Sequence, residues 1–414
     1  MRLSRNPCFF GTILFVLLLT CTCRKASIEQ SETNPLHSPS SEAVESIESV
    51  EAVESIESIE TLVVGVVEKC GGLIVRDTKT GRITEVDVAA NRSSIDDAAF
   101  AEVVRLTGLK KLSLSGGSLT GESLQKLETL TLLEELSLID TITSDSDLAS
   151  LCQKLKKLRR LTLRRLNNLS DQGLEAFHTL KELRNLALLN LSIGEAGLDT
   201  VSSLSSLRAL DLRGCNQLRP EDYQLLAKMT ALTDLKIGGA SVNAEVLRMI
   251  ASLPNLTSLT VEDTSVSVEV WEELFTNPQW TEKMTSLAFA RVNSLNDRVL
   301  EKLSGFKKLK TLSLRALFVR GSFVANLAPD SPLLTNLHTL GMTKNYATPE
   351  EILQLKRFKN LKKLDFSATL MTLEKVEALC TLDQIEVLVL IDCQLTDEMR
   401  EKLDSLETLV VIHE

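Results

Sequence analysis

Three arginines carry the clearest capacity for chemistry in this chain of 414 residues. Arg160 and Arg164 lie four positions apart in the stretch LRRLTLRR, and Arg213 follows further along the chain. Planar guanidinium groups bind carboxylate or phosphate groups through paired hydrogen bonds. We therefore expect these three residues to bind an acidic group on a partner. The alternative is that they pair, on a solvated face, with neighbouring acids such as Glu135 and Asp211.

Groups suited to catalysis are sparse by comparison. The histidines, at positions 37, 178, 338 and 413, are scattered, and none forms an evident pair with a nucleophile. No GxSxG, HExxH, phosphate-loop or dinucleotide-glycine motif is present. Three of the eight cysteines precede residue 24, and the other five are far apart, without disulfide or zinc spacing. We predict no enzymatic activity, no catalytic residue, no cofactor and no metal.

The elements that must position the arginines form a repeating unit, seen most clearly from Leu158 to Lys181. Leucines at 158, 161 and 163 alternate as in a strand, and apolar residues at 174, 177 and 180 then recur at helical spacing. This LxxLxL strand motif, or an apolar variant of it, returns at intervals of 24 to 28 residues. Its central apolar residue falls at Val86, Leu112, Leu136, Leu161, Leu186, Leu210, Leu235, Leu259, Leu287, Leu312, Leu340, Leu364, Leu388 and Ile412.

About 14 such repeats over residues 83–414 resemble the leucine-rich repeat family. The resemblance implies an α/β solenoid, or horseshoe, with a parallel β-sheet on the concave face and helices on the convex face. Crossovers long enough to hold a helix independently require parallel pairing of the strands. The residue expected to turn inward after the strand is Asn in much of the family, whereas here it is usually Thr or Cys. The repeats therefore resemble the cysteine/threonine type found in exported bacterial proteins, with Thr141, Cys215, Thr264, Thr369 and Cys393 at this position.

A solenoid needs its first coil covered, because an unpaired end exposes apolar side chains. Residues 61–88 are predicted to form this N-terminal cap, which leads into the first repeat strand. Within it, Leu73 to Arg76 and Arg82 to Val88 flank the turn DTKTG as a hairpin. In a longer repeat, Trp271 and Trp280 are expected to pack within an enlarged convex layer rather than to face a partner.

The C-terminal end is the second candidate surface. Val387, Val389 and Ile391 make the concave face apolar there, and the last strand, at 409–412, ends without an evident cap. An uncovered strand edge with apolar side chains is a template for pairing. We expect this edge to meet a partner or a second copy of the protein, with simple fraying of the terminus as the alternative.

Residues 1–23 read as a signal peptide or lipoprotein signal. Arg2 and Arg5 precede an apolar run of 16 residues, which at about 1.5 Å per residue is too short for a membrane-spanning helix. Leu18 to Cys21 resemble a bacterial lipoprotein box, so Cys21 is the candidate lipidation site, with Cys23 or simple cleavage as alternatives. Residues 24–60 are predicted to be a disordered acidic linker, or a segment that folds on a basic partner.

Charge supports a binding role without nucleic acid. The net charge is −10, half of it contributed by residues 1–60, so the repeats are nearly neutral and present no general attraction for nucleic acid or anionic lipid. We predict a protein-interaction scaffold in the cell envelope, membrane-tethered, periplasmic or extracellular, that binds a protein or surface polymer and touches the membrane only through a lipid anchor. The alternative is an intracellular adaptor resembling the repeat half of F-box ubiquitin-ligase subunits.

Overall fold

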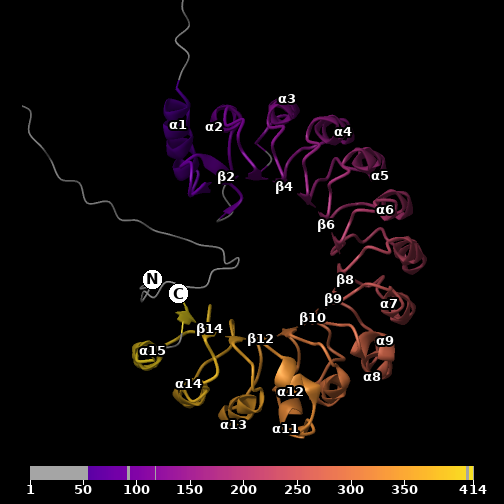
Figure 1. The fold of residues 1–414 in the computed structure, drawn as a ribbon, viewed down its shortest axis with the longest axis vertical. Helices are drawn as coiled ribbons and strands as arrows, with labels where there is room; N and C mark the ends of the chain where they lie inside the picture. The colour runs from indigo at the N-terminus through magenta and orange to yellow at the C-terminus, as the bar shows by residue number, and fades with distance from the viewer. Residues whose placement is uncertain (1–54, 91–93, 117, 407–409, 414) are drawn as a thin grey trace, which may run out of the picture. The chain divides into compact units, whose positions relative to one another are not determined.

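The computed structural model describes residues 55–90, 94–116, 118–406 and 410–413. The predicted signal segment with Cys21, and the linker up to residue 54, lie outside the described residues. Over the described segments, fifteen strands form one sheet in chain order, with β1 antiparallel to β2 and every later neighbour parallel. Helices cover one face of this sheet along its length, and the strands line the inner side of the arc (Figure 1). The predicted α/β leucine-rich repeat solenoid is confirmed.

The strands pair in one constant register, with central leucines such as Leu112, Leu136 and Leu161 side by side. Position +n below means n residues after this central residue of a coil. The strands are β1 Leu73–Arg76, β2 Ile83–Asp87, β3 Lys111–Ser115, β4 Glu135–Ile139, β5 Arg160–Arg164, β6 Asn185–Leu189, β7 Ala209–Asp211, β8 Asp234–Gly238, β9 Ser258–Glu262, β10 Ser286–Ala290, β11 Thr311–Arg315, β12 Thr339–Thr343, β13 Lys363–Asp365, β14 Val387–Val389 and β15 Val410–Ile412.

Short helices return the chain from the end of one strand to the start of the next. The α-helices are α1 Ile56–Lys69, α2 Asp97–Val103, α3 Gly121–Gln125, α4 Asp145–Lys154, α5 Asp171–Leu174, α6 Glu195–Ser202, α7 Ala244–Ala251, α8 Val268–Thr276, α9 Pro278–Thr281, α10 Asp297–Leu300, α11 Phe323–Asn326, α12 Pro332–Asn336, α13 Pro349–Gln354, α14 Leu373–Cys380 and α15 Asp397–Asp404. The 3₁₀ helices are η2 Lys126–Thr129, η3 Glu175–Thr179, η4 Pro220–Lys228, η5 Glu301–Gly305 and η6 Leu355–Arg357.

Hydrophobic burial decides the shape of each coil. In the coil of β5, Leu161 and Leu163 are buried, whereas the residues between and beside them face the other side of the sheet. Leu174 and Phe177 of the following helical turns pack against the same core. Each coil buries only half of a core, so stability comes from stacking coil on coil. Trp271 and Trp280 are fully buried, as the sequence predicts.

The inward position after the strand is buried, as the sequence indicates. Cys215 and Cys393 are 3% and 2% exposed, and their thiols donate to the backbone carbonyls of Leu188 and Phe366 of the preceding coil. Thr141, Thr264 and Thr369 occupy the same position and are also buried.

One backbone feature recurs just before that position. The residue at +4 has a positive φ in every coil from β3 to β14, although it is glycine in only three of them. Left-handed backbone favours glycine and costs other residues about 1–2 kcal/mol. Burial of the next residue, which this turn directs back into the core, offsets the cost of the left-handed conformation. The residues are Gly116, Asp140, Arg165, Asn190, Gly214, Gly239, Asp263, Arg291, Ala316, Lys344, Ala368 and Asp392.

The N-terminal cap begins earlier than predicted. The side chain of Ser55 caps helix α1, so residues 56–60 belong to this helix and not to the linker. Glu60 is buried in the cap and accepts hydrogen bonds from Arg76 at 2.5 Å and from the backbone N–H of Ile83 at 3.1 Å. Burial alone would raise the pKa of Glu60, but these bonds hold it below its ordinary value. Glu60 therefore joins α1 to the β1–β2 hairpin as a carboxylate.

The last strand is displaced by one residue from the predicted register. Leu388 of β14 pairs with Val411 of β15, so Val411 is the central residue of the final coil, not Ile412. Val410 and Ile412 therefore turn outward, with 54% and 38% of their surface exposed. Among the described residues, no helix is long and apolar enough to cross a membrane.

Candidate functional site

The concave face carries a row of alternating charges at the residue before each central leucine. Lys111 lies 3.0 Å from Glu85 and 3.7 Å from Glu135, and Arg160 lies 2.8 Å from the other oxygen of Glu135. The row therefore runs acid, base, acid, base across β2 to β5. Arg160, 53% exposed in its side chain, ends the row because the next coil presents the neutral Asn185.

Arg164 lies on the same strand as Arg160 but in a different environment. In register, it lies between Ile139 of β4 and Leu189 of β6. Its Nε is buried and has no hydrogen-bond partner. Its neighbours in register are nonpolar on both sides, and its charge acts on Asp140 of the preceding coil without forming an ion pair.

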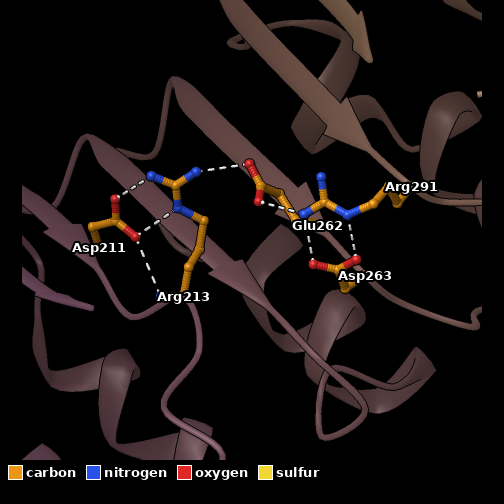
Figure 2. A network of polar contacts seen from close by, with 5 residues as sticks. All are labelled: Asp211, Arg213, Glu262, Asp263 and Arg291. Carbon is orange, nitrogen blue, oxygen red and sulfur yellow. Dashed lines mark hydrogen bonds and ion pairs between the residues drawn. The ribbon is translucent and has the colours of Figure 1, made fainter. Parts of the chain in front are cut away.

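Arg213 is the centre of a network that crosses four coils (Figure 2). It donates to Asp211 through Nε at 2.9 Å and Nη2 at 2.7 Å, and to Glu262 through Nη1 at 2.7 Å. The other oxygen of Glu262 accepts from Arg291 at 3.2 Å, and Arg291 also holds Asp263 at 2.6 and 2.7 Å. The bond with Asp211 raises the pKa of Arg213, although burial opposes it.

A glycine makes the bridge from Arg213 to Glu262 possible. Gly238 of β8 pairs with Glu262 of β9, and it stands two residues beyond the pair of Asp211 with Lys236. Gly238 is therefore at the same level as Arg213, on the strand between the two partners. A Cβ at this glycine would lie 2.6 Å from the backbone oxygen of Glu262 and 3.3 Å from its Cβ. Because Gly238 has no side chain, the side chains of Arg213 and Glu262 can meet across β8.

The structure therefore places the three predicted arginines on one side of the sheet but does not assemble them into one clamp. Arg160 and Arg213 are engaged by carboxylates, which is the pairing that the sequence offered as the alternative. Arg164 alone retains an unpaired buried donor. Whether any of the three binds an acidic partner stays a prediction.

An open hollow of about 240 Å³ lies on the concave face between β5 and β8. Arg160, Thr162, Asn185, Ala187, Asp234 and Lys236 are among the residues that line it. Its lining combines small side chains at 162 and 187 with charged side chains of both signs. The hollow suits a protruding polar or small apolar group of a partner.

The predicted C-terminal patch is only partly available. Val387 and Ile391 are half-buried, and Val389 is 8% exposed because β15 pairs alongside it. The exposed apolar side chains at this end are instead Val410 and Ile412 of β15 itself.

The described cysteines form no disulfide. Burial raises the pKa of the Cys152 and Cys215 thiols to about 12, so both are protonated at neutral pH and poor nucleophiles. Among residues 55–90, 94–116, 118–406 and 410–413, no group of three or more metal-ligating side chains is positioned to hold an ion.

Sequence reasoning missed an exposed apolar row, Phe318, Tyr346 and Leu370, where three consecutive coils leave the sheet. The signal was available. Among the coils of β3 to β14, all except these three and the one with Ile142 have Ser, Asn or Gln at +6: Ser118, Asn167, Ser192, Asn216, Ser241, Ser265, Asn293 and Gln394.

No protein-family model matches this chain, and a search of curated proteins finds no match. Solved structures do match. An internalin (InlF) from Listeria monocytogenes is 18% identical, with 80% of this chain and 96% of that chain covered and a TM-score of 0.40. A chain of the yeast Rad7–Elc1 complex is 15% identical, with 87% of this chain and 88% of that chain covered and a TM-score of 0.53. The second likeness agrees with the fold described above and shows the fold alone.

Proposed function

We propose that this protein is a non-enzymatic interaction scaffold that binds a protein or a surface polymer on its concave face. The observation that carries the proposal is the row of side chains at +1, which is small or polar in most coils and leaves the sheet face accessible. In the order β3 to β9, this row is Ser113, Ser137, Thr162, Ala187, Asp211, Lys236 and Thr260. The constant register below it makes that face a rigid platform.

The chemistry of the face favours a protein over nucleic acid. Its charges alternate in sign and largely neutralise one another, from Glu85 through Lys111 and Glu135 to Arg160. A phosphate backbone needs a run of cations instead. A protein loop that presents small polar groups together with one acidic group would fit the hollow beside Arg160.

Site-specific crosslinking in the native cell tests this proposal. A photo-reactive phenylalanine analogue replaces Ser137 or Thr162 on the concave face of the full chain, or Gln153 on the convex helix α4 as the matched control. We expect the same discrete crosslinked partner from both concave positions and none from the control. Equal crosslinking from Gln153 would place binding elsewhere and overturn the proposal.

We also propose that the protein acts in the cell envelope, tethered through Cys21 or released after cleavage. The support is the basic start and short apolar run of residues 1–23, followed by acidic polar sequence. The mass of the mature N-terminus decides between lipidated Cys21, lipidated Cys23 and simple cleavage. A cytosolic chain that retains Met1 would favour the second candidate, an adaptor resembling the repeat half of F-box ubiquitin-ligase subunits.

The exposed strand β15 supports a further proposal, that the C-terminal edge associates with a partner or a second copy. Among the described strands, β15 has a neighbour on one side only, and the side chains of Val410 and Ile412 are exposed. Light scattering of Val410→Lys beside the unaltered chain tests it. A monomer in both at micromolar concentration excludes self-association.

A further inference from the structure

The apolar row identified above, called here the apolar ridge, consists of Phe318, Tyr346 and Leu370. The central leucines of β11, β12 and β13 pair in register, and each ridge residue stands at +6 of its coil. The ridge therefore crosses three neighbouring coils on the edge where the chain leaves the sheet. These three apolar side chains lie outside the concave face, whose side chains come from within the strands, and Arg315 at the end of β11 stands where that face meets the ridge.

More than half of the surface of each ridge residue is exposed. Phe318 is 65% exposed, Tyr346 56% and Leu370 68%. The rings of Phe318 and Tyr346 stack on one another, with centroids 6.5 Å apart and planes 8° from parallel. Stacking holds both rings in place while leaving their outer surfaces bare, as in the aromatic anchors of binding hot spots.

The backbone under the ridge is firmly held. Each ridge residue stands between two buried neighbours, among them Val319 at 1%, Ala347 at 2% and Thr369 at 1% exposure. The backbone N–H of Tyr346 donates to the oxygen of Val319 at 3.4 Å, and the amide of Asn345 donates to Thr369 at 3.1 Å. These bonds link all three coils, so a partner would meet a pre-organised surface and lose little entropy on ordering it.

Three cations accompany the ridge without partners of their own. Arg315, Arg320 and Lys344 are exposed, and among the described residues none of their side chains makes an ion pair or a hydrogen bond. Two carboxylates on adjoining segments, Asp297 and Asp365, accept backbone N–H groups of the loops.

Several cations at equivalent positions elsewhere in the array are paired, although Arg164 at +3 of β5 is not. At +4, Arg165 is bound to Asp140 and Arg291 to Asp263, whereas Lys344 has alanine at +4 in both neighbouring coils. At +3, Arg213 is bound to Glu262, whereas Arg315 has Ala290 and Thr343 beside it in register. The acids that neutralise such cations in other coils are absent here.

We propose that the apolar ridge is a docking site for an acidic protein segment whose aromatic or aliphatic side chains alternate with carboxylates. Apolar side chains of the segment pack against the Phe318–Tyr346 stack and Leu370, and its carboxylates pair with Arg315, Arg320 and Lys344. Peptide is favoured over single-stranded nucleic acid because the two rings stack on each other and Leu370 offers no aromatic face for a base. This site goes beyond the concave-face function and stands or fails independently of it.

Fluorescence anisotropy with the full chain tests the proposal. The probe is a fluorescein-labelled peptide in which phenylalanine and leucine alternate with glutamate. We expect saturable binding with a Kd below about 1 mM that weakens as salt is added. Phe318→Ser with Tyr346→Ser should raise the Kd at least about tenfold, and so should Arg315→Glu with Lys344→Glu. These side chains are exposed, so the variants should fold.

Matched controls separate the ridge from a general surface effect. Ile142→Ser removes an exposed apolar side chain at +6 of a coil whose neighbours at +6 are polar, and Lys181→Glu reverses an exposed charge on another coil. Both should leave the Kd unchanged.

Four results would overturn the proposal: no saturable binding, equal loss from the control variants, equal binding of a peptide with glutamine in place of glutamate, or tighter binding of single-stranded oligothymidylate. Concave-face crosslinking that fails while the peptide still binds would count against the scaffold function alone.

Discussion

The substitution Gly238→Ala should break the Arg213 network although it replaces no charged residue. The new Cβ would stand 2.6 Å from the backbone oxygen of Glu262, so β8 and β9 must separate. Overpacking of this kind costs about 1–3 kcal/mol. The charge-assisted bond from Arg213 to Glu262 adds about 1 kcal/mol, below its general range because the two side chains are 31% and 17% exposed. We expect a total of about 2–4 kcal/mol.

Hydrogen exchange is the appropriate assay, because a long repeat array opens in parts and a single melting temperature averages over them. The amide of Gly239 donates to Glu262 at 3.0 Å across the same two strands. Its exchange should accelerate roughly 30- to 900-fold, from about 1.4 kcal/mol for each factor of ten. Amides of the distant strands β2 and β3 should be unaffected.

Gly341→Ala is the matched control. This glycine also lies within a strand, but its added Cβ would meet the hydroxyl of Ser313 at 3.2 Å, which can rotate away. A glycine replaced without a clash stabilises by up to about 1 kcal/mol. If the two variants behave alike, the close approach at Gly238 is not what matters. Glu262→Ala should also cost less in the Gly238→Ala background than alone, and additive costs would refute the idea that the glycine clears a path for the bridge.

Three further predictions concern other parts of the array. Gly173→Ala places a Cβ 2.6 Å from Leu169 Cδ1 and against the carboxylate of Asp145, so hydrogen exchange of the amides in its coil should show a loss of about 1–3 kcal/mol. Ala368→Gly relieves a left-handed residue at φ 54° and should stabilise by up to about 1 kcal/mol in the same assay. The hydrogen bond from Arg291 holds the pKa of Asp263 below its ordinary value, so its contribution is present above pH about 4 and is lost as the pH falls further, which a melting series from neutral to acid pH would detect.

Each of these has a control within the chain. Gly108→Ala adds a Cβ that meets nothing within 4 Å, so a loss equal to that of Gly173→Ala would contradict the packing argument. Ala347→Gly at a buried position without positive φ should destabilise, opposite in sign to Ala368→Gly. Arg291→Gln should flatten the acid dependence, and an unchanged profile would show that Asp263 does not contribute to it.

The repeats were predictable because their signal is local and periodic. Alternating leucines such as Leu161 and Leu163 identify the buried face of one strand, and each coil contacts only its neighbours. The prediction was wrong where the alternation disappears. In residues 409–412 four apolar residues stand in a row, so the pattern could not choose between Val411 and Ile412 as the central residue.

The beginning of the cap was missed for a related reason. Valine and isoleucine at every third position from 44 to 59 do not form a helical stripe, yet a helix starts at Ile56. Its burial is provided by Val63 and Val67 further along, together with the buried contact of Glu60 to the hairpin. The partners that define this start, the valines at 63 and 67 and the hairpin, all lie beyond residue 60.

The site was predictable only as far as adjacent coils. Glu135 and Asp211 could be named as partners of the arginines because they lie on the same or the next strand. Glu262 could not, since its bond to Arg213 skips a coil and exists only because Gly238 lies between them. Leu370 could not be predicted as a surface residue, because a leucine within a leucine-rich pattern is expected to be buried. Here it is 68% exposed.

A charged side chain at one repeat position can therefore be neutralised or left available to a partner, depending on the residue at the same position of the neighbouring coil. Where opposite charges meet at +4, as in Arg291 with Asp263, the side chains satisfy each other and the surface offers nothing to a partner. Lys344 has the same backbone conformation but alanines on both sides, so its charge remains available. In an array built from nearest-neighbour contacts, a binding site can arise by losing two acids from adjacent coils, without any change to the core. Introducing an acid beside Lys344 should therefore close the binding site. In Ala316→Asp, the new carboxylate would pair with Lys344 as Asp263 does with Arg291. Binding of the acidic peptide should weaken, and the melting temperature should be unchanged or higher. Stronger peptide binding in this variant would show that the open charge is not what the ridge uses.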